Sequence, residues 1–267
     1  MKRSLLYQIG AGGESEFSDM LAEVELAERL GFDTVWCFPE AGEEGGFLEG
    51  APAIWLSALS ERTDRIRLGW GVAAMMPPAI PPIRLAEQAA SIDLASRGRL
   101  EMAFLPGALL DDGDAGSWDE GVRMLVDMWD GPAFSWTSAR FRVMPVEIVP
   151  KPIQKPHPPL WLTGWSLDHA RKAGEAGLAF LDVSGASDDV LEAHRQAYLD
   201  ARRLADPDAL VAMGLRAIAI DLSPDAPNEE RIEAWGAAGV DQLILRAGPL
   251  EGGHAEACRR IRCLAGA

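Results

Sequence analysis

Hydrophobic and polar residues alternate with two different periods along the chain, and residues 84–104 show both in succession. In the first part of this segment, apolar residues recur at three- and four-residue spacing, which is the period of an amphipathic helix. After Gly98, the residues Leu100, Met102 and Phe104 alternate with their neighbours at the period of a strand. The segment therefore predicts a helix that turns at a glycine directly into a buried strand.

The same unit recurs from end to end and predicts a parallel sheet with crossover helices. Helical stripes such as Phe17–Leu30 separate the strand candidates. With 267 residues, near the roughly 250 of an eightfold barrel, the chain is predicted to be one α/β domain over residues 1–267, a single (β/α)8 TIM barrel. Eight segments are predicted strands: Ser4–Ile9, Thr34–Phe38, Ile66–Ala73, Arg99–Leu105, Leu160–Thr163, Ala179–Val183, Val211–Ile220 and Gln242–Leu245.

Three glycines stand in the same place relative to the predicted strands. Gly31, Gly177 and Gly239 each follow a helical stripe that contains alanine and precede an apolar residue that begins a strand. Glycine ends helices because it adopts the left-handed conformation without a steric penalty. We expect all three to terminate helices, and we interpret this repeat as structural. Residues 129–160, by contrast, are rich in turn residues and proline, and they predict an excursion over the surface without a second domain.

Composition and charge exclude several functions. The formal net charge of −16 repels nucleic-acid phosphates and anionic lipids, which argues against binding to either. No apolar window reaches the roughly 18 residues of a membrane helix, and the first residues run into a strand without a cleavage-site pattern, so we expect a cytoplasmic protein. The cysteines Cys37, Cys258 and Cys263 show no disulfide or zinc spacing, and no metal site is predicted.

The histidines form no catalytic pattern in the sequence. We expect surface or capping roles for all four, which are His157, His169, His194 and His254. The motifs of serine hydrolases, nucleoside triphosphatases, HExxH metalloproteases and Rossmann dehydrogenases are also absent from the sequence.

Residues 84–104, together with FDTVW at 32–36 and ERTDRIRLGWGVA at 61–73, resemble the front half of bacterial-luciferase-like monooxygenases. The resemblance extends over nearly the whole chain. It implies a flavin-dependent oxidoreductase that uses reduced FMN and dioxygen, or the deazaflavin F420, on a small organic substrate. It also implies a homodimer. In such enzymes the cofactor carries the redox chemistry, while the protein binds and orients it.

The junction after the fifth predicted strand is the principal candidate for binding the cofactor. Here Thr163, Gly164 and Trp165 lead to Ser166, a favoured N-cap residue, and a helix follows at once. The free amides and the dipole of a helix N-terminus suit a phosphate, and Gly164 permits close approach. The resemblance implies that the flavin phosphate binds at this junction, although most strand–Ser–helix junctions only cap a helix.

Other candidates follow from the resemblance. Ala74 and Met75, at the end of the third strand, are the implied place for the isoalloxazine ring, with a strained non-proline cis peptide between them; core packing is the alternative. Relatives commonly carry an Arg-Gly pair near the phosphate, where this chain has Pro106-Gly107. Arg246, at the end of the last strand, is the candidate that replaces the lost charge, and a surface ion pair is the alternative.

Glu40 is the candidate proton-transfer residue. Relatives continue after the second strand to a Glu-His-His cluster, whereas this chain reads CFPEAGEEGG and contains no histidine there. A dry pocket would raise the pKa of Glu40 enough for a base, and an exposed acid is the alternative. Two further hypotheses thus remain open. The first is a catalytically degenerate family member that binds flavin or another ligand without turnover, or that is a structural partner of an active subunit. The second is a cofactor-free barrel enzyme that uses Glu40 with other carboxylates as acid and base.

Overall fold

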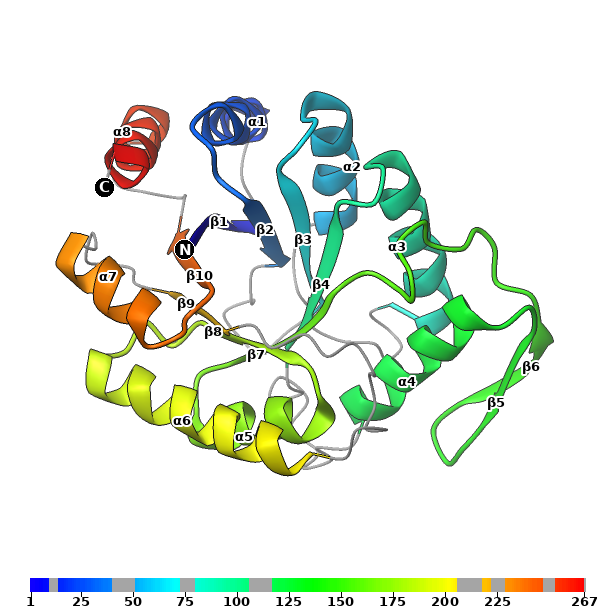
Figure 1. Cartoon of the computed structure of the whole chain (residues 1–267). Helices are drawn as coiled ribbons and strands as arrows, with labels where there is room; N and C mark the ends of the chain where they lie inside the picture. Colours follow the sequence, from blue (N-terminus) through cyan, green and yellow to red (C-terminus); the bar gives the residue numbers. More distant parts are fainter. Residues whose placement is uncertain are drawn as a thin grey trace.

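The computed structural model describes residues 1–9, 14–39, 51–72, 80–105, 117–205, 218–221, 229–246 and 253–266. Within these ranges a parallel sheet lies at the centre and helices cover its outer side (Figure 1). The strands of the main sheet are β1 (Lys2–Ile9), β2 (Thr34–Pro39), β3 (Arg67–Val72), β4 (Leu100–Phe104), β7 (Leu160–Gly164), β8 (Ala179–Asp182), β9 (Ile218–Asp221) and β10 (Gln242–Arg246).

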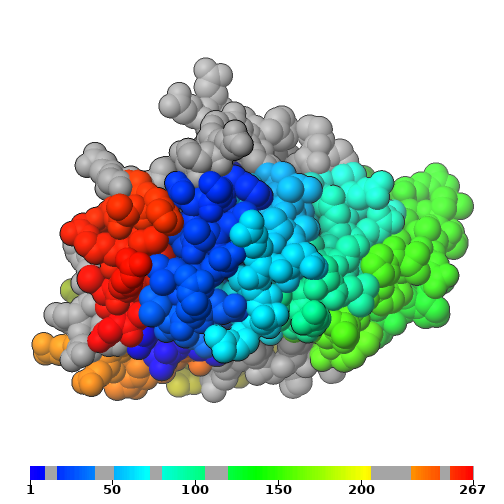
Figure 2. All heavy atoms as spheres, turned by 90° about the horizontal axis from the view of Figure 1, so that it is seen from above, coloured from blue at the N-terminus to red at the C-terminus, as the bar shows by residue number. Residues whose placement is uncertain are grey.

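Helices alternate with these strands along the chain. They are α1 (Glu14–Arg29), α2 (Pro52–Arg62), α3 (Pro82–Ala95), α4 (Ser117–Asp130), α5 (Leu167–Ala176), α6 (Asp188–Leu204), α7 (Glu229–Ala237) and α8 (Gly253–Gly266). The helices α8, α1, α2 and α3 lie side by side on the face shown in Figure 2, so the first and last helices of the chain are neighbours.

The strand order of the main sheet is β1-β10-β9-β8-β7-β4-β3-β2, and all of these pairings are parallel. Because β1 pairs with β10 on one side and with β2 on the other, the sheet curls back toward its first strand. The predicted α/β alternation is therefore confirmed. Each predicted strand overlaps an observed one, although the part of Val211–Ile220 before Ile218 lies outside the described residues.

The three glycines predicted to end helices do so. Gly31, Gly177 and Gly239 have φ angles of 83°, 76° and 87°, in the left-handed region that glycine adopts without strain. At Gly177 the backbone N–H donates to the carbonyls of Ala173 and Gly174, which closes the end of α5. Each of these turns feeds the chain into the next strand of the sheet, and the sequence alone specifies them.

Residues 129–160 contain the predicted excursion. An antiparallel hairpin of β5 (Phe134–Thr137) and β6 (Arg142–Val146) projects beyond the main sheet on the right of Figure 1. The Trp136 indole N–H donates to Glu120 of α4 at 2.7 Å, which holds the hairpin against that helix.

Aromatic side chains fill the inner side of the curled sheet. Trp36 and Phe38 of β2 belong to an inner apolar cluster with Trp161. Their rings lie directly against the backbone of β3, because a Cβ added at Gly69 would meet Trp36 and one added at Gly71 would meet Phe38. The space beside the two glycines of β3 is therefore filled by the side chains of Trp36 and Phe38.

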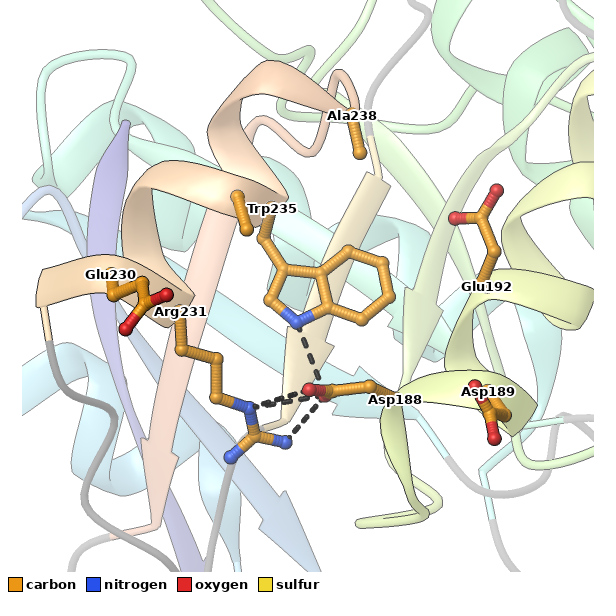
Figure 3. A pocket seen from close by; sticks show the side chains of 8 residues that line it. Asp188, Asp189, Glu192, Glu230, Arg231, Trp235 and Ala238 are labelled. Atoms are coloured by element: carbon orange, nitrogen blue, oxygen red, sulfur yellow. Dashed lines mark hydrogen bonds and ion pairs between the residues drawn. The ribbon is translucent and has the colours of Figure 1, made fainter.

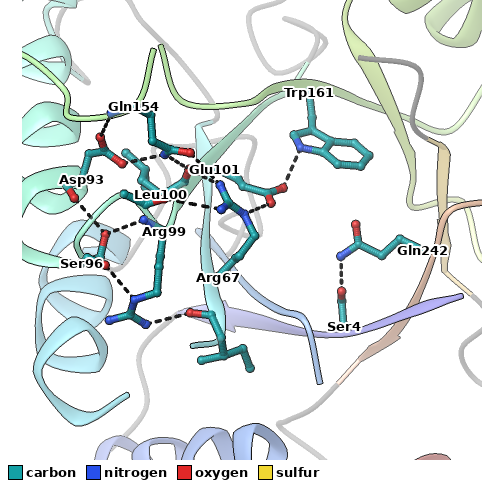
Figure 4. Close-up of polar contacts among 12 residues, drawn as sticks. Ser4, Arg67, Asp93, Ser96, Arg99, Leu100, Glu101, Gln154, Trp161 and Gln242 are labelled. Atoms are coloured by element: carbon teal, nitrogen blue, oxygen red, sulfur yellow. Dashed lines mark hydrogen bonds and ion pairs between the residues drawn. The ribbon is translucent and has the colours of Figure 1, made fainter. Parts of the chain in front are cut away.

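A polar cluster closes the same inner side near the amino ends of the strands (Figure 4). Arg67, the first residue of β3, forms an ion pair with Glu101 of β4 and donates to Gln154 at 3.0 Å. The other oxygen of Glu101 accepts the Trp161 indole N–H at 2.9 Å. Each of these polar groups has a hydrogen-bond partner, as polar groups inside a protein require. We therefore interpret the cluster as structural: it stabilises the sheet near the amino ends of the strands.

Asp93 connects α3 to the segment that leads into β7. Its side chain is fully buried and accepts the backbone N–H groups of Ile153 and Gln154 at 2.9 and 3.0 Å (Figure 4). The Gln154 amide adds a third hydrogen bond at 2.7 Å. One carboxylate thus fixes the path of the chain as it returns from the hairpin to the sheet.

Candidate functional site

The carboxyl ends of the parallel strands are the edge where proteins of this architecture place their chemistry. Several predicted site residues at this edge, namely Glu40, Ala74 and Met75, lie outside the described residues, as do Pro106 and Gly107. Their roles therefore stay predictions. The predicted residues that the structure describes are the junction between β7 and α5 and Arg246.

The junction forms the expected capped helix start. Ser166 has extended backbone angles, with φ −148° and ψ 161°, and its hydroxyl accepts the N–H of His169 at 3.3 Å. Its carbonyl accepts the N–H of Ala170 at 3.1 Å, so the helix begins immediately after it. Ser166 is thus the N-cap of α5, and the remaining amides of the first turn have no acceptor within the helix.

Thr163 and Gly164 contribute to packing at this junction. The buried Thr163 hydroxyl donates to the carbonyl of Phe104 at 2.7 Å and thereby ties β7 to β4. A Cβ added at Gly164 would lie 2.5 Å from Cβ of His169 and 2.8 Å from the Phe180 ring. The structure therefore explains why residue 164 is a glycine, which the sequence did not: a side chain here would collide with α5 and β8.

His169 and Trp165 interact across the first turn of α5. The half-exposed Trp165 ring meets the His169 ring edge to face at a centroid distance of 4.7 Å. The backbone N–H of Trp165 donates to His169 Nδ1 at 3.4 Å. The sequence predicted only that His169 lies on a helix in a surface or capping role. Its position three residues after a serine N-cap could have indicated that it lies in the first turn, next to the junction.

The electrostatics around His169 favour its neutral form. Burial lowers the pKa of His169, Lys172 lowers it further, and Asp168 opposes the shift. Asp168 accepts a hydrogen bond from Lys172 at 2.8 Å, which lowers the pKa of that carboxyl. A neutral imidazole accepts a hydrogen bond at its unprotonated nitrogen. This agrees with Nδ1 as the acceptor of the Trp165 N–H.

Arg246 lies at the same edge as the junction. Its guanidinium donates to the carbonyl of Val183 at 3.0 Å, and the N–H of Val183 donates to the carbonyl of Gly164 at 2.9 Å. Val183 is therefore a shared neighbour of Arg246 and Gly164. Arg246 is half-buried and has a backbone carbonyl as a partner, so the structure brings together two of the residues predicted to bind the phosphate.

A buried pair lies directly behind the junction. Asp182 pairs with Gly164 in the sheet, and one of its oxygens lies 2.7 Å from His194 Nδ1 on α6. Its other oxygen accepts the N–H of Ser184 at 2.9 Å. The prediction of a surface or capping role is wrong for His194, and also for His157, because both are buried. Sequence periodicity missed the pair because its partners come from different elements.

A cleft of about 470 Å³ lies in the outer layer between α6 and α7 (Figure 3). Asp188 occupies it and receives hydrogen bonds from Arg231 at 2.7 Å and from the Trp235 indole at 3.3 Å. The ion pair with Arg231 lowers the pKa of Asp188. These groups hold α6 to α7, and no residue of the β7–α5 junction is among those that line the cleft.

No helix in the described ranges has the length and apolar character needed to cross a bilayer. The same ranges contain no group of three or more histidine, cysteine or acidic side chains arranged to hold a metal ion.

Comparison with known proteins identifies relatives of the chain. A family model described as luciferase-like monooxygenase matches residues 4–259. The luciferase-like monooxygenase of Escherichia coli K12 is 28% identical over 238 residues, which cover 81% of this chain and 65% of that protein. The oxygenase component of the flavin-dependent trigonelline monooxygenase of Acinetobacter baylyi is 26% identical over 160 residues, which cover 55% of this chain and 42% of that protein. The matched part of the chain thus spans 42% to 65% of the length of these relatives.

Solved structures show the same fold. The monooxygenase RslO1 from Streptomyces bottropensis superimposes with a TM-score of 0.75 at 21% identity, covering 100% of this chain and 98% of that chain. An F420-dependent secondary alcohol dehydrogenase superimposes with a TM-score of 0.68 at 15% identity, covering 99% of each chain.

Proposed function

We propose, because the chain belongs to the luciferase-like monooxygenase family, that it is a flavin-dependent oxidoreductase that acts on a small organic substrate. The cofactor is reduced FMN with dioxygen, or the deazaflavin F420. Relatives named as flavin-dependent and as F420-dependent enzymes support this class. We further propose that the whole chain is a single (β/α)8 barrel domain, which the strand order supports, and that it acts as a cytoplasmic homodimer.

The observation that carries the proposal is the start of α5 at the carboxyl edge of the sheet. The cofactors of this class carry an anionic phosphate, and the residues present suit one. Ser166 caps the helix and leaves first-turn amides without an intrahelical acceptor, which with the helix dipole attract an anion. Arg246 adds a fixed positive charge at the same edge. The Asp168 carboxylate is offset by its ion pairs with Lys172 and Arg171.

In this proposal each described residue has a limited task. Gly164, Trp165 and Ser166 present the helix N-terminus to the phosphate, and Arg246 neutralises part of its charge. Thr163 holds β7 in place through its bond to Phe104. Trp36 and Phe38 fill the inner side of the sheet, which keeps water from entering below the edge. The bound ring supplies the electron or hydride transfer that these side chains do not provide.

The remaining predicted residues complete the proposed site. Ala74 and Met75 support the isoalloxazine ring, and Glu40 moves a proton between substrate and solvent. The carboxyl ends of β2 and β3, which precede these residues, are neighbours in the sheet. Their position in the strand order therefore supports a shared ring and substrate region.

A second candidate function is binding without turnover. Two donors at the junction already have protein acceptors: the Trp165 N–H donates to His169, and the His169 N–H donates to Ser166. The sequence also lacks the histidine and the arginine expected after the second and fourth strands. These observations favour a family member that holds a flavin, or another ligand, in support of an active subunit.

Cofactor titration tests the proposal. Purified protein is titrated with FMN, riboflavin and F420 while intrinsic fluorescence and visible absorbance are recorded. We expect FMN or F420 to bind, and we expect Arg246→Gln to weaken FMN binding about tenfold while riboflavin, which lacks the phosphate, is affected less, because hydrogen bonds to charged groups contribute roughly 1.5–3 kcal/mol.

The matched control is Arg231→Gln, since Arg231 pairs with Asp188 in the outer cleft and its loss should leave FMN affinity unchanged. Binding of neither cofactor would overturn the assignment. Tight binding with no oxidation of reduced flavin and no F420 reduction across a panel of small alcohols, aldehydes and ketones would favour binding without turnover.

A further inference from the structure

A buried glutamate lies between the first and last helices of the chain, among residues that the candidate site does not include. Glu23 belongs to α1, which lies beside α8 on the face shown in Figure 2, and its side chain is 5% exposed. One of its oxygens accepts the hydroxyl of Tyr7 on β1 at 2.7 Å. The other lies 2.8 Å from Nδ1 of His254, the second residue of α8. Both oxygens of Glu23 therefore have partners, which come from two different elements.

The contact with Glu23 decides which nitrogen of His254 carries the hydrogen. A carboxylate accepts hydrogen bonds and does not donate them. Nδ1 is therefore the nitrogen that carries hydrogen, and Nε2 is left as an acceptor. Burial raises the pKa of Tyr7 and Glu23 raises it further, so the phenol keeps its proton and remains a donor to Glu23. Tyr7 thus holds the carboxylate in the position from which it orients the imidazole.

A thiol lies against the same imidazole. Cys258 follows His254 by four residues, which places the two side chains on one face of α8. Its Sγ is 3.6 Å from Nε2 and 3.9 Å from Nδ1. Because Nδ1 is directed to Glu23, Nε2 is the nitrogen that accepts the S–H. Cys258 is partly exposed, so a small molecule can reach its sulfur from solvent.

Glu23, His254 and Cys258 form a chain of contacts of the kind that activates a nucleophile. The base lies within reach of the nucleophile, and a third group orients the base. Helical spacing alone would bring a histidine and a cysteine into contact, but it would not orient the imidazole. The buried carboxylate does so, and it stabilises the imidazolium that forms when the ring takes a proton.

The charges around Cys258 select the class of reagent. Burial raises the pKa of Cys258, Glu23 raises it further, Arg262 lowers it and Asp19 raises it. At rest the sulfur is therefore a thiol, and it becomes a nucleophile as its proton moves to His254. The nearby carboxylates, in a chain with a net charge of −16, repel anionic reagents. The site therefore suits a small, uncharged electrophile.

We propose that Cys258 is a site of reversible oxidation by a small uncharged hydroperoxide, with His254 as its general base and Glu23 as the residue that positions the base. The sulfur attacks one peroxide oxygen and gives up two electrons as the O–O bond breaks. The thiol proton passes to Nε2 of His254 and then to the departing oxygen. Thiol and hydroperoxide thus become a sulfenic acid and an alcohol, or a sulfenic acid and water when the reagent is hydrogen peroxide.

Cys263 is the internal control for this chemistry. It lies nine residues after His254, about 180° around the helix at roughly 3.6 residues per turn, and it is more exposed than Cys258. Exposure alone therefore predicts faster oxidation of Cys263, whereas an oriented base predicts faster oxidation of Cys258. Purified protein is treated with hydrogen peroxide, and the sulfenic acids are trapped with dimedone. Trypsin cleaves at the arginines between the two cysteines, so peptide mass spectrometry reports each separately. We expect Cys258 to react about tenfold faster than Cys263.

Two variants test the partners of Cys258. His254→Gln cannot take the thiol proton and should slow the oxidation of Cys258 about tenfold, with Cys263 unchanged. In Glu23→Gln the amide oxygen still accepts the Tyr7 hydroxyl, so the amide NH₂ faces Nδ1 and the ring hydrogen moves to Nε2. We expect the same loss of rate, together with a change of tautomer in the nitrogen-15 NMR spectrum of the His254 ring. The matched control on α8 is Glu256→Gln, which removes only the ion pair with Arg259 and should leave both rates unchanged.

The rates decide the inference once circular dichroism has shown that the variants are folded. Oxidation of Cys263 as fast as that of Cys258 overturns it, and so does an unchanged Cys258 rate in His254→Gln. A loss of rate in Glu23→Gln without a change of tautomer overturns the positioning role. An anionic aromatic disulfide, used in place of hydrogen peroxide, should react faster with Cys263, and a preference for Cys258 would overturn the choice of an uncharged reagent. Because the experiment contains no flavin, its result is independent of the proposed function.

Discussion

Gly164→Ala tests whether the end of β7 is shaped for packing or for a ligand. The new Cβ would lie 2.5 Å from Cβ of His169 and 2.8 Å from the Phe180 ring. Carbon atoms in contact are normally about 3.5–4.0 Å apart, so an overlap of about 1 Å must be relieved. Neither neighbour moves freely, because one is anchored to the first turn of α5 and the other is fully buried.

The magnitude follows from two opposing effects. Overpacking in a tight region costs about 1–3 kcal/mol, and alanine returns roughly 0.4–1 kcal/mol because it restricts the unfolded chain. We therefore expect the free energy of unfolding to fall by about 1–2 kcal/mol. At about 2–4 °C per kcal/mol for a chain of this size, Tm falls by about 2–8 °C.

The assay is thermal and urea unfolding followed by circular dichroism, with Gly236→Ala as the matched control. Gly236 lies within α7, and the nearest atom to its added Cβ is the methyl carbon of Met1 at 4.0 Å. In the control, the free energy of unfolding should rise by about 0.5–1 kcal/mol, because alanine has a higher helix propensity than glycine. If Gly164→Ala were as stable as the parent yet bound FMN more weakly, the packing explanation would be refuted and close approach of the ligand would be the reason for the glycine.

Two further predictions concern the described core. Asp93→Ala should lower the free energy of unfolding by about 3–5 kcal/mol in urea titrations, because three donors of Ile153 and Gln154 lose a buried, charged acceptor. The control is Glu87→Ala, on the exposed side of the same helix, where the Glu87 carboxylate pairs only with Arg84 among the described residues. It should change the free energy of unfolding by less than about 0.5 kcal/mol, and equal effects of the two variants would contradict the argument. The pKa of Cys37 is raised by complete burial, so in mass-spectrometric labelling at neutral pH with a thiol reagent Cys37 should react only on unfolding while the exposed Cys263 reacts at once. Labelling of Cys37 at the rate of Cys263 would show that β2 opens in the native state.

Local signals in the sequence determined the elements and their order. A helix stripe, a terminal glycine and an alternating strand are all read from residues a few positions apart, and their physics is equally local. Gly31, Gly177 and Gly239 adopt positive φ because the next residue must enter a strand, and Ser166 caps α5 because its hydroxyl reaches an amide three residues away. These features needed no knowledge of the neighbouring strands.

Only the tertiary structure decided which side chains meet. Asp182 and His194 are twelve residues apart, and His194 appeared from the sequence to be a surface residue until α6 packed on β8 and buried both. Likewise Gly69 and Gly71 leave space for the rings of Trp36 and Phe38 on a neighbouring strand, and Gly164 leaves space for His169 and Phe180. Burial and side-chain contacts depend on strand order and helix packing, which are properties of the whole chain. The type of a residue therefore predicted its local backbone conformation better than it predicted which residues it contacts.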